Sequence, residues 1–160
     1  MRWGALALVL GALAIVSSCT ESADLKQALR ITDAAGGWYD AGVVQGKNKL
    51  VPGVRFRLRK TGDVDISQVS VNALFRAADG VESGLDNDVF VQNVKFDGDQ
   101  SAPVAVRSDN GYTAEPPQSR AEMLKHSQFR DMRVQIFVKY GASQWTDLGR
   151  IDVPRTLLTQ

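Results

Sequence analysis

MRVQIFVKY, residues 132–140, is the stretch of sequence that decides the fold. Its side chains alternate with a period of two, apolar at one set of positions and mostly polar at the other: Met132, Val134, Ile136, Val138 and Tyr140 against Arg133, Gln135, Phe137 and Lys139. Successive side chains of a β-strand point to opposite faces of a sheet, so this alternation predicts a strand with one buried face. The other face meets water or a partner.

The same alternation recurs on the N-terminal side of this stretch. Residues 54–58 and 69–76 repeat it, and further strands are expected at residues 29–33, 89–96, 102–107 and 144–153. Turn-forming residues separate these segments at 60–63, 79–80, 97–99, 109–111 and 141–143. About seven short strands joined by turns predict an all-β fold, an antiparallel immunoglobulin-like β-sandwich.

One segment before the final hairpin departs from this pattern. Ser119 is positioned to cap a helix, and Glu122, three residues later, can reach back to complete a capping box. The sequence therefore predicts a short helix over residues 120–127, with Met123 and Leu124 packed inward. Immunoglobulin-like sandwiches cross from one sheet to the other here, so the helix favours a Greek-key arrangement over a simple meander.

The N-terminal segment has the features of an export signal. Arg2 gives a short positive region, residues 3–16 are apolar, and the segment ends at Cys19, the only cysteine of the chain. This ending resembles the lipobox of bacterial lipoproteins, Val16-Ser17-Ser18-Cys19. The resemblance implies that the Cys19 thiol is joined to lipid and that Cys19 becomes the first mature residue.

The lipobox resemblance divides the chain into a signal peptide (1–18), a lipidated N-terminus and tether (19–27) and a β-sandwich domain (28–160). An uncleaved anchor is the first alternative, but an apolar helix of about 14 residues spans only ~21 Å, short of the ~30 Å hydrocarbon core. The second is ordinary secretion, which would expose an unpaired Cys19 thiol in an oxidising compartment.

The same resemblance implies where the protein resides. Thr20, rather than an aspartate, follows the cysteine, and this resembles an outer-membrane address. We therefore expect a protein of the bacterial cell envelope, held in the outer membrane by its acylated N-terminus and facing the periplasm. Another envelope protein is the expected partner.

Composition narrows the class of protein. The chain is 44% hydrophobic and 23% charged, typical of a globular domain, and its formal net charge is only +1. A balance so close to neutral gives no reason to expect nucleic-acid binding. Because Cys19 is the only cysteine, the domain must fold without an internal disulfide.

A second resemblance covers residues 54–80. The run Val-Arg-Phe-Arg-Leu-Arg-Lys-Thr-Gly, the alternating strand after it and the closing Asp79-Gly80 are similar to FxLYD-type immunoglobulin-like domains of bacterial envelope proteins. This chain has Leu74-Phe75-Arg76 where that family has Leu-Tyr-Asp. The resemblance implies the fold and an accessory role, but no activity.

The sequence predicts neither an enzyme nor a cofactor. His126 is the only histidine, it follows the predicted helix, and no serine-nucleophile motif accompanies it. Zinc would require more His and Cys ligands than the chain contains. The acidic runs 86–88 and 97–99 lack the spacing of a calcium loop and are interpreted as turns, with calcium as the less favoured alternative.

The outward side of one sheet is the best candidate for a binding surface. If strands 70–76, 133–139 and 146–150 are neighbours, apolar side chains ringed by cations would gather there and suit a protein partner or an anionic lipid head group. The predicted partner-binding residues are Leu74, Arg76, Arg133, Phe137, Lys139, Leu148 and Arg150. Alternatively, Phe137 and Leu148 form only a cross-strand pair, or a bulge beside Asp147 and Gly149 turns Leu148 inward.

A row of arginines and three large aromatic residues are further candidates for a binding surface. Arg55, Arg57 and Arg59 form a basic stripe that is interpreted as a solvated face with acidic partners, with contact to an anionic membrane as the alternative. A sugar ring could stack on Trp38, Tyr39 or Trp145, although large aromatic residues usually belong to the core.

The expected function is a non-enzymatic, lipid-anchored envelope protein acting as an interaction or accessory module. The alternative is a binding domain for a small envelope ligand, either a lipid or a glycan.

Overall fold

The computed structural model describes residues 24–158, so the predicted signal peptide and Cys19 lie outside the described residues. Two short helices and nine strands make up the described part: α1 Leu25–Ala28, β1 Leu29–Val44, β2 Lys47–Lys60, β3 Gln68–Ala77, β4 Asn87–Asp97, β5 Gln100–Ser101, β6 Val104–Arg107, β7 Tyr112–Ala114, α2 Arg120–Lys125, β8 Met132–Lys139 and β9 Thr146–Val153. The predicted all-β class is confirmed.

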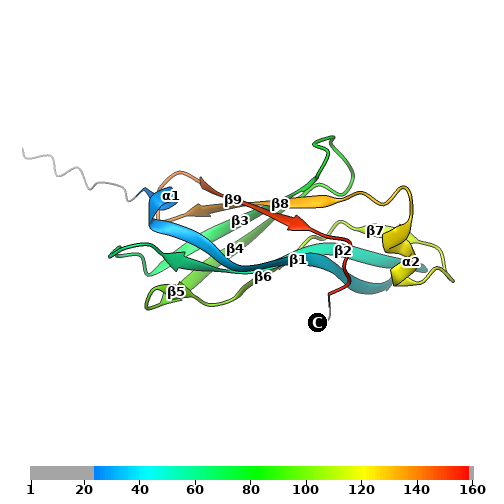
Figure 1. Ribbon diagram of the computed structural model, residues 1–160, viewed down its shortest axis with the longest axis horizontal. Coiled ribbons are helices and arrows are strands. Elements are labelled where there is room, and N and C mark those ends of the chain that lie inside the picture. The colour runs from blue at the N-terminus through cyan, green and yellow to red at the C-terminus, as the bar shows by residue number, and fades with distance from the viewer. Residues whose placement is uncertain (1–23, 159–160) are drawn as a thin grey trace, which may run out of the picture.

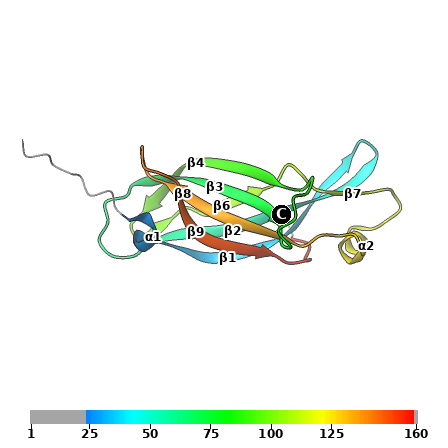
Figure 2. The same cartoon turned by 90° about the horizontal axis from the view of Figure 1, so that it is seen from above.

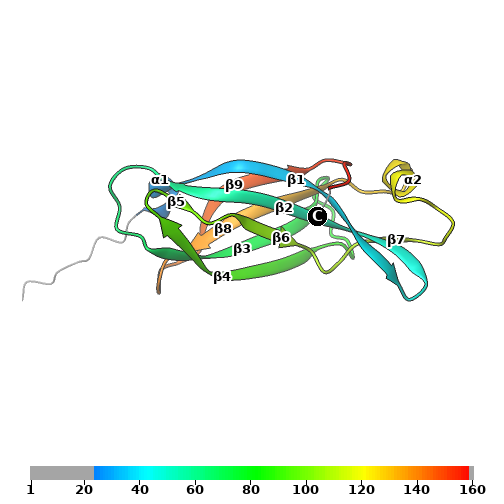
Figure 3. The ribbon, with the colours of Figure 1, turned by 90° about the horizontal axis from the view of Figure 1, so that it is seen from below.

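The strands form one connected antiparallel network. Its order is β1-β2-β5-β4-β3-β8-β9, and β6 and β7 also pair with β2. The two-residue strand β5 links β2 to β4, so all nine strands belong to one connected sheet. Seen from above, β4, β3, β8 and β9 lie in front, whereas β1, β2 and β6 lie in front when the molecule is seen from below (Figures 2 and 3).

The core lies between these two groups of strands, as Figure 1 indicates. In β8 the predicted alternation holds at every position from Met132 to Lys139, with buried side chains alternating with half-exposed ones. Phe56 of β2 and Phe75 of β3 enter the core from opposite sides, and each is 1% exposed or less. Full burial of such a side chain contributes about 1.5–3 kcal/mol, so the alternation has a direct energetic basis.

Strand β1 is much longer than the predicted segment 29–33. Its middle contains Gly36, at which a Cβ atom would lie 2.2 Å from the backbone oxygen of Asp152, so only glycine permits this approach of β1 to β9. After β9, the Trp38 N–H donates to the carbonyl oxygen of Thr156 (2.8 Å), and the Leu158 N–H donates to that of Trp38 (2.7 Å). The C-terminal residues are thereby hydrogen-bonded to β1.

The helices refine two predicted boundaries. The capping box at the start of α2 is present, with Ser119 Oγ accepting from the Glu122 N–H and Glu122 Oε2 accepting from the Ser119 N–H (2.7 Å). The helix ends at Lys125, two residues before the predicted end. Helix α1 begins within the range assigned to the tether, and its Leu25 is buried, so the folded part begins before residue 28.

Candidate interaction face

The predicted neighbours β3, β8 and β9 lie side by side. Arg76 of β3 pairs with Arg133 of β8, and Gln135 of β8 pairs with Arg150 of β9. Strand β4 lies on the other side of β3, where Phe90 pairs with Asn72. The outward side of these four strands is called the interaction face below. It comprises an arginine cluster, an aromatic pair and the residues between them.

The arginine cluster consists of Arg76, Arg133 and Arg150. These three residues line a shallow cavity of about 180 Å³ together with Leu74, Ala77, Ala78, Gly80 and Gln135. Small residues from the end of β3 leave this space open, and Leu74 gives it an apolar wall. Four of the lining residues are among the predicted partner-binding residues, and the structure brings them together: Leu74, Arg76, Arg133 and Arg150.

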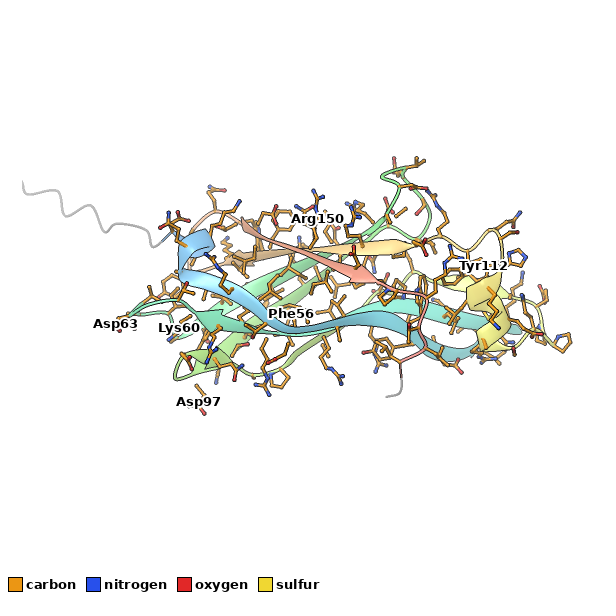
Figure 4. All side chains as sticks on the ribbon, viewed as in Figure 1. Phe56, Lys60, Asp63, Asp97, Tyr112 and Arg150 are labelled. Carbon is orange, nitrogen blue, oxygen red and sulfur yellow. The ribbon has the colours of Figure 1, made fainter. Side chains whose placement is uncertain are left out.

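The three arginines differ in their acidic partners. Arg133 Nε lies 3.1 Å from Asp152 Oδ1, and Arg76 lies 3.8 Å from Asp86 and 3.5 Å from Asp88. Arg150, in contrast, has no carboxylate at ion-pair distance within residues 24–158. Figure 4 shows Arg150 pointing away from the strands, on the side opposite the layer that contains β2. Its guanidinium group is the one most available to a partner.

The aromatic pair, Phe90 and Trp145, lies farther along the same face. Their ring centroids are 6.0 Å apart, and the exposed fractions are 59% for Phe90 and 40% for Trp145. A depression of about 250 Å³ adjoins them, lined also by Ser70, Val71, Val91, Gln92, Lys139 and Gly141. Lys139 Nζ lies 6.0 Å from the centroid of the Trp145 ring, within cation–π range.

Phe137 and Asn72 connect the aromatic pair with the arginine cluster. Asn72 pairs with Phe137 on one side and with Phe90 on the other. Phe137 is half-buried in this row, and the Asn72 Oδ1 atom is buried without a hydrogen-bond partner among the described residues.

Leu148 does not belong to this face, although it was predicted there. The register of β8 and β9 shifts between Ile136, which faces Gly149, and Phe137, which faces Asp147. Leu148 is the extra residue of this bulge, and it packs against the core. Gly149 has a φ of 135° at this point, a backbone conformation that favours glycine. The alternative of a bulge that turns Leu148 inward was therefore correct.

Sequence reasoning missed Phe90 and misjudged Trp145. Phe90 stands between Val89 and Val91 in an uninterrupted apolar run, so the alternation alone did not indicate which side faced out. Trp145 was expected in the core with Trp38 and Tyr39, and the latter two are indeed buried. The turn-forming residues 141–143 were the available signal that Trp145 lies next to a turn, just before β9 begins at Thr146.

The remaining candidates for chemistry have structural roles. His126 Nδ1 accepts from the Gln128 N–H (3.2 Å) and lies 3.0 Å from the Tyr112 hydroxyl oxygen, at the end of α2. Within the described part of the chain, no three His, Cys, Asp or Glu side chains gather where they could hold a metal ion.

No helix among residues 24–158 is long and apolar enough to cross a bilayer.

One exposed ion pair supports the loop beside the arginine cluster. Arg130 Nη2 donates to Asp79 Oδ1 at 2.6 Å, and this hydrogen bond holds the pKa of Asp79 below its ordinary value. The Val81 N–H also donates to Asp79 Oδ1 (3.0 Å). These bonds fix the turn that carries Ala78 and Gly80 on the cavity wall.

Comparison with family models, with curated proteins and with solved structures finds no match for this chain.

Proposed function

We propose that this protein is a non-enzymatic, lipid-anchored module of the bacterial cell envelope whose interaction face binds another envelope protein. The observation that carries the proposal is the joint presence, on one outward sheet face, of an exposed Phe90–Trp145 pair and an arginine cluster in which Arg150 lacks an acidic partner among the described residues.

The composition of this face supports a protein partner. Residues that contribute most to protein binding are enriched in Trp, Tyr and Arg, and they cluster where neighbouring groups exclude water. Most of the face belongs to regular strands with near-continuous pairing across β4, β3, β8 and β9. Side chains on such strands lose little freedom on binding, which lowers the entropic cost of association.

The N-terminal anchor is the second part of the proposal. The lipobox resemblance supports acylation at Cys19, and the described chain begins five residues later at Asp24. Five extended residues reach at most about 18 Å, so an acylated Cys19 would keep the domain close to its bilayer. Intact-mass analysis of the protein from its native membrane tests this directly, since acylation adds the mass of the chains and a free thiol would contradict it.

The protein partner is tested by cross-linking in the native membrane, followed by detergent extraction and pull-down. We compare the wild type with Phe90→Glu, and use Val43→Glu as a matched control because Val43 is 62% exposed at the distant tip of the β1–β2 hairpin. A partner should be recovered with the wild type and the control but be lost with Phe90→Glu. Its measured affinity should fall at least about 30-fold, the equivalent of 2 kcal/mol.

Equal recovery of every partner with all three proteins would contradict this role of the interaction face. Both variants must first match the wild type in circular dichroism and in thermal unfolding. Exposed substitutions of this kind change stability by only about 0.5 kcal/mol, so a loss of folding is not expected.

A small envelope ligand is the second candidate, and the depression beside Phe90 and Trp145 favours it. Ser70, Gln92 and Lys139 supply hydrogen-bonding groups around the exposed aromatic rings. Titration with envelope glycans and lipids, followed by Trp145 fluorescence with Trp145→Phe as control, tests this function. Saturable quenching that disappears in the variant would favour a ligand, and no change at any concentration would exclude it.

A further inference from the structure

A second charged surface lies on the opposite side of the molecule. Five arginines project outward from β1, β2 and β6, and they are called the basic face below: Arg30, Arg55, Arg57, Arg59 and Arg107. Arg30 pairs directly with Arg59 across β1 and β2. The residues that alternate with the arginines of β2, namely Val54, Phe56 and Leu58, are buried in the core. The sequence therefore directs every arginine of β2 to the outside.

Acidic partners neutralise only part of this face. Arg59 lies 3.1 Å from Asp99, and Arg57 lies 3.9 Å from Asp33. Arg30, Arg55 and Arg107 have no carboxylate at ion-pair distance in the described part of the chain. The predicted stripe of Arg55, Arg57 and Arg59 thus has acidic partners at two of its three arginines.

One further opposing pair of charges borders this face. Lys95 and Asp97 line the same open depression as Arg57. Their charges are of opposite sign, so the excess of positive charge on the basic face remains.

Small neighbours leave the basic face open. Arg55 pairs with Ala35 of β1 and Ala105 of β6, neither of which is tall enough to cover a guanidinium group. No large aromatic side chain is exposed on this face among the described residues, unlike the interaction face. Its chemistry is therefore electrostatic and suits closely spaced negative charges rather than a protein hot spot.

Part of the basic face is held rigidly by stacking. The guanidinium carbon of Arg107 lies 3.9 Å from the centroid of the Tyr39 ring. The Tyr39 ring in turn lies over Gly53, where a Cβ atom would be 2.5 Å from a ring carbon. Glycine at this position thus makes room for the ring on which Arg107 stacks. A planar guanidinium group fixed in this way is prepared for bidentate contact with a phosphate.

We propose that the basic face docks on the phosphate-bearing head groups of the membrane that holds the anchor. This inference rests on the acylated Cys19 of the proposed function. Arg30 comes two residues after α1, at the end of the domain where the described chain begins (Figure 1). A short connection to the lipid brings this end of the face near the bilayer, where anionic head groups attract Lys and Arg side chains. The interaction face is then turned away from the membrane.

A site-specific fluorophore tests this orientation in the full acylated protein. Because lipid blocks the Cys19 thiol, Ala105→Cys supplies a single reactive thiol within the basic face. Glu82→Cys supplies the matched control, since Glu82 is exposed in the loop between β3 and β4, which rises on the opposite side (Figure 1). Each labelled protein is reconstituted into vesicles that carry a head-group quencher, with either phosphatidylcholine alone or added phosphatidylglycerol.

We expect strong quenching of the label at position 105, only with phosphatidylglycerol, and weak quenching at position 82. Replacing Arg55 and Arg57 together by glutamine should lower the docked-to-free ratio up to about fivefold for each arginine, whereas lysine at both positions should retain most of it. Raising the ionic strength from 0.1 to 1 M should also release the face, because the Debye length falls from about 10 to about 3 Å.

Equal quenching at the two positions, or quenching independent of Arg55 and Arg57, would overturn the proposal. Circular dichroism of each labelled variant before reconstitution ensures that only folded protein is compared. The intact mass of the same sample reports acylation, so loss of the anchor and loss of docking give different results.

Discussion

The interaction face and the basic face are built by the same period-two alternation, yet they differ in what they expose. The interaction face combines exposed aromatic rings with arginines, of which Arg76 and Arg133 are paired with aspartates. The basic face has no exposed large aromatic residue in the described part of the chain, and three of its five arginines lack acidic partners there. Alternation thus determines which side chains face outward, but their neighbours determine what those side chains can bind.

The largest effect should come from the core that both faces share. Phe56 lies beneath the basic face and Phe75 beneath the interaction face, and truncating either to alanine should cost about 3–5 kcal/mol. Urea unfolding followed by circular dichroism measures this cost. A single transition of lowered midpoint is expected in both variants, because the strands form one network. Two separate transitions would mean that the two faces fold independently.

A smaller effect should separate the paired from the unpaired arginines of the interaction face. Asp152→Arg would place a second guanidinium group opposite Arg133 across β8 and β9, and we expect a destabilisation of about 0.2–1 kcal/mol from this repulsion. Arg150→Glu faces Gln135 and should leave the free energy of unfolding nearly unchanged. Thermal unfolding of the two variants at low salt distinguishes them. Equal destabilisation would show that Arg150 has a structural partner after all.

The third effect depends on pH and concerns the turn beside the arginine cluster. The hydrogen bond from Arg130 lowers the pKa of Asp79, so the native state favours the ionised carboxylate. Its stabilising contribution is present above the unfolded pKa, near 3.8, and is lost as the pH falls through the lower folded value. The wild type should therefore exceed Asp79→Asn in stability at pH 6, with the difference vanishing at strongly acidic pH.

Urea unfolding of both proteins across this pH range is the measurement. A difference that persisted unchanged at the acidic end would indicate that Asp79 acts through its hydrogen bond to the Val81 N–H rather than through its charge. Because Asp79 is exposed, the effect should be the smallest of the three.

Strict alternation made β3 and β8 predictable almost to the residue. Each buries every second side chain, so a register error would expose a whole set of apolar groups. Strand β1 was predicted as five residues and has sixteen, since Ala34-Ala35-Gly36-Gly37 carries no alternation although it continues the pairing with β2. Strand β7, which follows the turn at 109–111, was too short to leave a pattern.

The same limits of the alternation explain which residues of the interaction face could be predicted from the sequence. Alternation correctly grouped Leu74, Arg76, Arg133 and Arg150, because all lie on regular strands. Leu148 was assigned to the wrong side, since one extra residue in a bulge reverses the parity of what precedes it. Trp145 reaches across neighbouring strands to Phe90, and no spacing in the sequence reports that contact.

The hydrogen bonds between Trp38 and the C-terminal residues affect how readily the protein could pair with other copies of itself. An open strand edge offers unpaired N–H and C=O groups to any other chain, and this is a common route to aggregation. Here the Trp38 N–H and C=O are occupied by Thr156 and Leu158 of the same molecule. The last described residues thus cover the β1 edge at Trp38, where they should keep a neighbouring copy from pairing.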